Sequence, residues 1–177
     1  MLAFAMSLAT ARRADACGAW SMRDLERKLM VSWQTSRAAV RQDVPHGKQV
    51  AEAEVIYDND TLELLDAHGR PIVTADSGSV RHAGAALGRV RGEAVTVGTD
   101  TFTIDVSPTG KEVDLEHQTF YWFTVHVTSG DRDVLVSDAA MGLCSAHEPP
   151  SPVAREHQRA EITARVVAYL GWRAAGM

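Results

Sequence analysis

The chain has 177 residues, 45% of them apolar, and a formal net charge of −5 at pH 7. This size and apolar content favour one domain with a hydrophobic core over residues 17–177. Residues 49–150 carry a net charge of −11, residues 17–48 carry +3 and residues 151–177 carry +2, a balance that excludes the clustered basic face of a nucleic-acid-binding domain. No run approaches the ~20 apolar residues of a transmembrane helix, so we expect no membrane span.

Residues 1–16 resemble a secretory signal peptide. An apolar run over residues 1–9 is followed by Ala14-Asp15-Ala16, which presents small side chains at the −3 and −1 positions of a cut before Cys17. Two arginines follow the apolar run instead of preceding it, which leaves a cytoplasmic protein as the alternative. We expect a secreted or periplasmic protein. Lipid anchoring through Cys17 is a weaker reading, because a leucine-rich triplet does not precede that cysteine.

The chain has two cysteines, Cys17 and Cys144. Two cysteines in an oxidising compartment usually pair, so export implies a disulfide between them. The alternative, in a cytoplasmic protein, is two free and buried thiols.

Residues 21–42 are predicted to form an amphipathic helix. Their apolar residues recur at steps near 3.6, and Ser21 with Asp24 resembles a capping box. The apolar stripe comprises Met22, Leu25, Leu29, Trp33 and Val40.

The middle of the chain, residues 48–138, is predicted to be an antiparallel β meander of about six to eight strands, with a partial barrel as a variant. Asp58-Asn59-Asp60 marks a hairpin, residues 107–110 read as a tight turn, and residues 119–128 form the strongest strand. A proline-rich linker, residues 149–152, leads into a helix over residues 152–173. Within that helix Ile162, Val166 and Tyr169 form an apolar row, and Glu161 pairs with Arg165 at i,i+4. The predicted class is therefore α+β, with helices at both ends.

One strand face is the best sequence candidate for a functional surface. Phe120, Trp122, Thr124 and His126 alternate along the predicted strand and share one face. If this face is exposed, we expect it to contact a protein or a small ligand. The alternative is that a terminal helix covers it.

No motif for catalysis, metal binding or cofactor binding occurs in the sequence. The seven histidines lack zinc-ligand spacing, Asp58-Asn59-Asp60 fails the EF-hand pattern, and no nucleophile elbow is present. We therefore expect an exported accessory, ligand-binding or structural domain, with no cofactor, metal site or catalytic residue. One alternative is a small hydrolase or metal-dependent enzyme in which His82, His117, His126 and Asp138 converge only in the fold. Another is a cytosolic interaction protein.

Arg89 and Arg91 lie two residues apart in a glycine-punctuated segment. The glycine spacing there is not that of a phosphate loop. On a strand the two arginines share one face, where they hold an anion or keep an edge strand from pairing.

Overall fold

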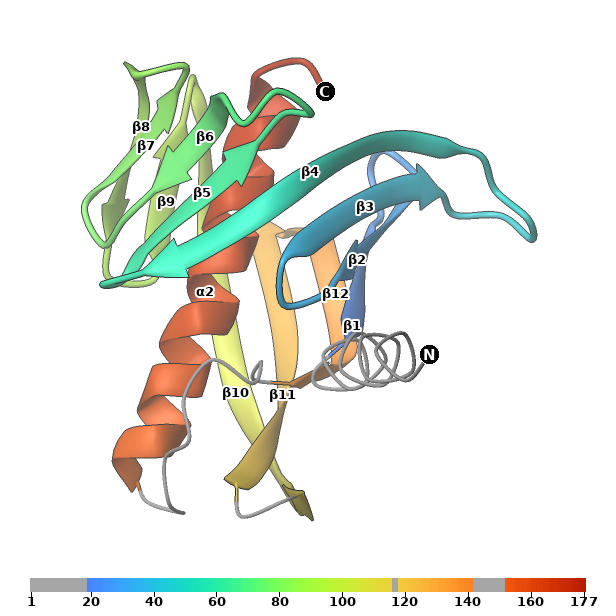
Figure 1. Cartoon of the computed structure of the whole chain (residues 1–177), viewed down its shortest axis with the longest axis vertical. Helices are drawn as coiled ribbons and strands as arrows, with labels where there is room; N and C mark the ends of the chain where they lie inside the picture. The colour runs from blue at the N-terminus through green and yellow to red at the C-terminus, as the bar shows by residue number, and fades with distance from the viewer. Residues whose placement is uncertain (1–18, 116–117, 142–151) are drawn as a thin grey trace, which may run out of the picture.

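The computed structural model describes residues 19–115, 118–141 and 152–177. These ranges contain a closed antiparallel barrel of twelve strands and one helix, labelled α2 (Figure 1). The strands are β1 (Trp20–Asp24), β2 (Leu29–Trp33), β3 (Arg37–Gln42), β4 (Gln49–Asp58), β5 (Thr61–Leu65), β6 (Pro71–Ala75), β7 (Ser79–His82), β8 (Ala85–Arg91), β9 (Ala94–Val97), β10 (Asp100–Leu115), β11 (Gln118–Ser129) and β12 (Arg132–Met141), and the helix is α2 (Pro152–Ala174).

Each strand pairs with the next along the chain, and β1 closes the barrel against β12. At this seam Arg23 is opposite Val136, and the Leu25 amide donates to the Val134 carbonyl at 2.9 Å. The predicted hairpin at Asp58-Asn59-Asp60 joins β4 to β5. Asn59 and Asp60 both adopt positive φ, which a two-residue hairpin turn of type I′ requires and which Asn and Asp tolerate.

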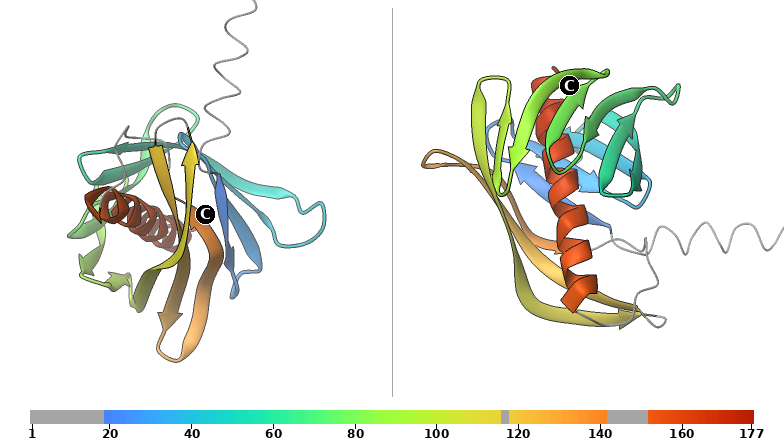
Figure 2. Two further views of the ribbon diagram at one scale, coloured as in Figure 1. Left: turned by 90° about the horizontal axis from the view of Figure 1, so that it is seen from below. Right: turned by 90° about the vertical axis from the view of Figure 1, so that its left-hand side faces the viewer.

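Helix α2 lies along the concave inner side of the barrel wall (Figure 2). Nearly every residue from Glu161 to Trp172 is buried, whereas a helix on a protein surface buries only one stripe. The row Ile162, Val166 and Tyr169 faces the core as predicted, with each side chain at most 1% exposed. No helix in the described ranges is long and apolar enough to cross a membrane.

The predicted helix over residues 21–42 is wrong, because this segment forms β1, β2 and β3. Within each short piece the buried residues alternate with exposed or half-buried ones. Trp20 is opposite Trp33, and Val31 lies opposite both Met22 and Val40. Tryptophan and β-branched residues favour strands, and these pairings bury them against one another, which an isolated helix cannot do.

The residues of the supposed capping box have other partners. The Ser21 hydroxyl hydrogen-bonds across the sheet to the Ser32 hydroxyl at 3.1 Å. The Asp24 carboxylate accepts the Arg27 amide at 2.8 Å, which closes the β1–β2 turn. The Ser-x-x-Asp spacing is therefore compatible with a strand and the turn that follows it, and does not by itself indicate the start of a helix.

The predicted α+β class with six to eight strands is likewise corrected to a twelve-stranded barrel. The glycine-rich segment 79–91 divides into β7 and β8 around a turn at Ala83 and Gly84, both at positive φ. The predicted turn at 107–110 instead lies inside β10 at a bulge between Pro108, which pairs with Phe123, and Glu112, which pairs with Tyr121. There the Thr109 hydroxyl donates to the Trp122 carbonyl at 3.1 Å, so the chain keeps its pairing with β11.

Buried polar side chains attach α2 to the barrel. Arg165 is 1% exposed, and its guanidinium donates to Glu161 at 3.0 Å and to the carbonyls of Gln34 and Thr35 at 3.2 and 3.3 Å. The predicted Glu161–Arg165 pair is thus present, in the interior instead of on a solvated face. The guanidinium also lies 5.4 Å from the Trp33 ring centroid, in cation–π range.

Two further contacts join α2 to the strands. The Gln158 side chain accepts the Tyr121 amide at 3.0 Å and donates to the Thr119 carbonyl at 2.9 Å. The helix thereby provides hydrogen-bond partners for the β11 backbone just outside its ladder with β12, which pairs from Trp122 onward.

Candidate functional site

A cavity of about 660 Å³ lies between α2 and the inner face of β8 and β10, beside the β8–β9 turn at Gly92 and Glu93. Its mouth is bordered by the β4–β5 turn at Asp60 and by the turn after β6 at Asp76 and Ser77. This volume is within the range of small-molecule pockets in proteins, about 300–1,000 Å³. Its lining residues are Tyr57, Asp60, Asp76, Ser77, Val90, Gly92, Glu93, Ile104, Val106, Glu156, His157, Arg159, Ala160, Thr163, Ala164 and Val167.

The floor of the cavity is apolar. Val90, Ile104 and Val106 come from the strands, since alternate residues of β8 and β10 face inward. Ala160 and Ala164 come from α2, where i,i+4 spacing places them one above the other. The cavity exists partly because the helix presents methyl groups here in place of larger side chains.

The rim of the cavity is acidic. Its lining includes the carboxylates of Asp60, Asp76, Glu93 and Glu156 and the guanidinium of Arg159. A second guanidinium, that of Arg81 outside the lining, is paired with Asp76 at 2.8 Å. Arg159 donates to the Val106 carbonyl at 2.9 Å, and its guanidinium lies 3.6 Å from both the Glu93 and the Glu156 carboxylates. The cation is thus matched by its neighbours, and the rim as a whole keeps an excess of negative charge.

Asp76 is held ionised by its hydrogen bonds. Burial raises its pKa, but the Gly78 amide, the Arg81 guanidinium and the Ser79 hydroxyl and amide outweigh burial and lower the pKa to about 2. The four donors lie 2.7–2.9 Å from the carboxylate oxygens. Asp76 therefore fixes the β6–β7 turn and stays ionised, with its charge offset by the paired Arg81 guanidinium.

Tyr57 is a neutral phenol at the cavity wall. Burial, followed by the charges of Asp60 and Glu161, raises its pKa to about 12. Its hydroxyl donates to the Asp60 carboxylate at 3.3 Å. Tyr57 can donate a hydrogen bond at neutral pH, but it cannot act as a base there.

The residues proposed from the sequence lie elsewhere, on the outer side of β11. Phe120 is 2% exposed and Trp122 is half-buried, while Thr124 and His126 are exposed. The Thr124 hydroxyl donates to the Ser107 carbonyl at 3.3 Å, and His126 Nε2 lies 2.7 Å from Asp133 Oδ1. The structure thus places these four residues on one strand, but it leaves them without a shared aromatic surface, since Phe120 is covered.

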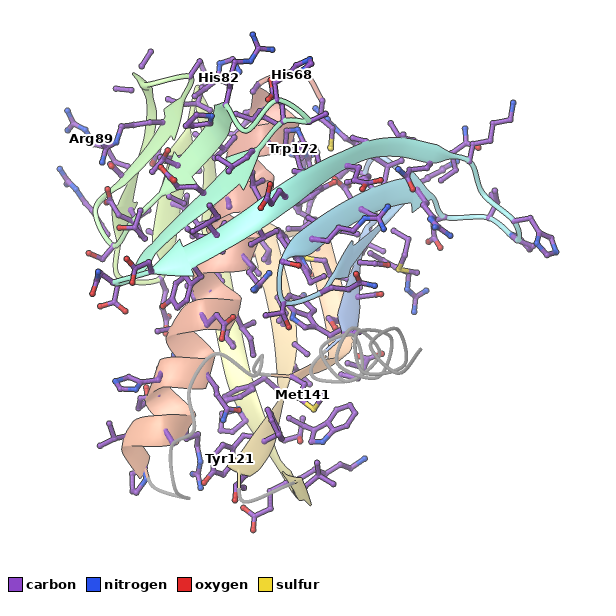
Figure 3. The ribbon with its side chains drawn as sticks, viewed as in Figure 1. His68, His82, Arg89, Tyr121, Met141 and Trp172 are labelled. Atoms are coloured by element: carbon purple, nitrogen blue, oxygen red, sulfur yellow. The ribbon has the colours of Figure 1, made fainter. Side chains whose placement is uncertain are left out.

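Of the residues named in the enzyme alternative, His82 lies apart from the others in the described ranges, whereas His126 on β11 and Asp138 on β12 lie on neighbouring strands. His82 lies on β7 and His126 on β11, and the barrel order places three strands between them. Figure 3 shows His82 near His68 at one end of the molecule, while Tyr121 and Met141 of the β11–β12 region lie toward the other. His117, Cys17 and Cys144 lie outside the described residues. In those residues no group of three or more His, Cys, Asp or Glu side chains is placed to hold a metal ion.

Sequence reasoning missed the cavity because its lining comes from helix, strands and turns far apart in the chain. The one local signal was the pair of alanines Ala160 and Ala164 on a helix whose other face is bulky. Comparison of the chain with protein-family models, with curated proteins and with solved structures finds no match.

Proposed function

We propose that this protein is a binding domain for a small amphipathic cation, and that the ligand occupies the cavity between α2 and strands β8 and β10. One observation carries the proposal: an apolar floor large enough for a small molecule lies beneath a rim with four carboxylates and one guanidinium. A ligand with an apolar body and a positively charged head matches both parts.

The floor supports the apolar half of the ligand. Val90, Ile104 and Val167 present hydrocarbon to the cavity, and Ala160 and Ala164 leave room beside them. Each methylene transferred from water to such a surface contributes about 0.8 kcal/mol to binding.

The rim supports the positive charge of the ligand. Glu93 and Glu156 flank the guanidinium of Arg159, and the lining also includes the carboxylate of Asp60 and that of Asp76, which is paired with Arg81. An anionic ligand would meet this excess of negative charge, which is repulsive at close range. Selectivity for cations over anions of equal length is therefore the expected signature.

Two polar groups of the cavity, Tyr57 and Asp76, are poorly suited to general acid–base catalysis. The high pKa of Tyr57 and the low pKa of Asp76 hold both groups in one protonation state near neutral pH, whereas a general acid or base titrates near the working pH. The Thr163 hydroxyl donates to the Arg159 carbonyl within the helix at 2.9 Å, so it is engaged in the helix backbone.

Isothermal titration calorimetry with octyltrimethylammonium and octyl sulfate tests the proposal. We expect saturable binding of the cation and at least about tenfold weaker binding of the anion of the same chain length. The Ala164→Leu variant fills the floor of the cavity and is expected to abolish binding of the cation. Ala174→Leu makes the same change at an exposed position of α2 and is expected to bind like the wild type.

Equal affinity for the two amphiphiles would overturn the charge assignment. Equal loss of binding in both leucine variants would show that the cavity is not the site. Circular dichroism of each variant verifies that the barrel is folded in these experiments.

A further inference from the structure

We infer that the outer face of β8 and β9 carries a second site, at which Arg89 and Arg91 bind a phosphate-type oxyanion. This site is independent of the proposed cation cavity, because the two lie on opposite sides of β8. Val90 faces the cavity, and strand geometry directs the two arginines that flank it to the other face. Figure 3 shows Arg89 pointing away from the barrel.

The site is a hollow of about 510 Å³. Arg89 and Arg91 border it, and Thr96 of β9 lies opposite Arg89 in the ladder. The Thr96 hydroxyl is hydrogen-bonded to the Thr101 hydroxyl at 3.3 Å, so hydroxyl groups lie beside the guanidinium groups. The remaining lining is mostly small, and consists of Ala86, Leu87, Gly88, Ala94 and Gly98.

Gly88 brings the two backbones together at the base of this hollow. A Cβ atom at this position would lie 2.2 Å from the Thr96 carbonyl oxygen, which no side chain can tolerate. The ladder between β7 and β8 also shifts register here, since Val80 pairs with Gly88 but Arg81 pairs with Ala86. Such a bulge bends a strand and re-aims the residues after it, in this case the two arginines.

The arginines are not explained by protection of a sheet edge. Strand β8 pairs with β7 on one side and with β9 on the other, so it has no free edge to protect. Nor are they explained by ion pairing, because in the described ranges neither guanidinium has an ion pair or a hydrogen bond. By contrast, Arg81 on the neighbouring strand is paired with Asp76 at 2.8 Å.

Two unpaired guanidinium groups beside hydroxyls favour a tetrahedral oxyanion. Each guanidinium offers a planar fork of N–H donors that matches two oxygens of a phosphate group. Their Cα atoms lie roughly 7 Å apart by strand geometry, so the two forks can converge on one phosphate or span a diphosphate. The small residues of the hollow let the anion approach the backbone closely.

Isothermal titration calorimetry at low salt, with inorganic pyrophosphate added to the full chain, tests this inference. We expect saturable binding by the wild type and at least about tenfold weaker binding by the R89A/R91A variant. The matched control is R23A/R41A. It removes two exposed arginines from β1 and β3 that lie on either side of Met30 in the ladder, and it is expected to bind like the wild type.

The R89K/R91K variant keeps both charges but removes the planar forks, so we expect an intermediate affinity. It also serves as the test if R89A/R91A does not fold. Absence of saturable pyrophosphate binding by the wild type would overturn the inference. Equal weakening of binding in R89A/R91A and R23A/R41A would also overturn it, because that result reflects net charge alone.

Vesicles distinguish the two sources of a phosphate group. Co-sedimentation with phosphatidylglycerol vesicles that is lost in R89A/R91A identifies a lipid headgroup as the ligand. Pyrophosphate binding without co-sedimentation identifies a soluble phosphate compound. Both results support the oxyanion site, and neither affects the amphiphile experiment on the inner cavity.

Discussion

Asp24 shows how a single residue acquires its role from its surroundings. Its side chain is fully buried and accepts hydrogen bonds from the Tyr169 hydroxyl at 2.8 Å and from the Arg173 guanidinium at 3.1 Å. Burial is the main cause of a raised pKa for Tyr169, so this tyrosine remains a neutral donor. The carboxylate therefore links the first strand of the barrel to the last turns of α2.

At the same scale, Asp76 predicts how stability depends on pH. Its pKa of about 2 in the folded protein is below its ordinary value of 3.8. The ionised form is thus stabilised by folding above pH 4, and this contribution is lost as the pH falls from about 4 to 2. We expect Asp76→Asn to lower the free energy of unfolding by up to about 2 kcal/mol at pH 7.

Urea unfolding at pH 7 and at pH 2.5 measures this effect. The difference between wild type and Asp76→Asn should shrink at the lower pH. Asp43→Asn, at an exposed position after β3, is the control and should change little at either pH. A pH-independent difference for Asp76→Asn would contradict the assigned role of the carboxylate charge.

At the scale of elements, the inward-facing side chains of the strands pack against α2. Gly171 marks its closest approach to the wall, since a Cβ atom there would lie 2.6 Å from Val80 Cγ1 and 3.1 Å from Val73 Cγ1. Both valines are fully buried. The absence of a side chain at this position therefore sets the distance between the helix and strands β6 and β7.

We predict that Gly171→Ala destabilises the protein by roughly 1–3 kcal/mol, despite the higher helix propensity of alanine, because it overpacks the core. Thermal unfolding measures the change. Gly78→Ala is the control, because a Cβ atom there makes only an ordinary 3.7 Å contact with Asp76. Stabilisation of the protein by Gly171→Ala would contradict the close packing of α2.

At the scale of the whole molecule, the predicted export and disulfide remain predictions, because Cys17 and Cys144 lie outside the described residues. Intact-mass spectrometry of protein recovered from a bacterial host tests both. We expect a species that begins at Cys17 and gains about two mass units on reduction. A full-length mass that reductant leaves unchanged would contradict both predictions.

Local patterns predicted the elements whose signal is local. The helix over 152–173, its buried row and the hairpin at Asp58-Asn59-Asp60 follow from periodicity and turn chemistry within a few residues. The helix prediction for residues 21–42 was wrong because the spacing of the apolar residues fits a 3.6-residue helical stripe as well as it fits three short alternating strands. Only the pairing of Trp20 with Trp33 and of Val31 with Val40 decides between these readings.

The sequence by itself determined that the chain has an apolar core, an acidic β-rich middle and a C-terminal helix with an apolar row, because composition and periodicity are properties of neighbouring residues. The tertiary structure alone decided that twelve strands close into a barrel, that α2 lies inside it, and that the proposed cavity joins Tyr57, Glu93 and Ala164. These features depend on contacts between residues far apart in the chain, and each such contact is stabilised only when the whole barrel forms.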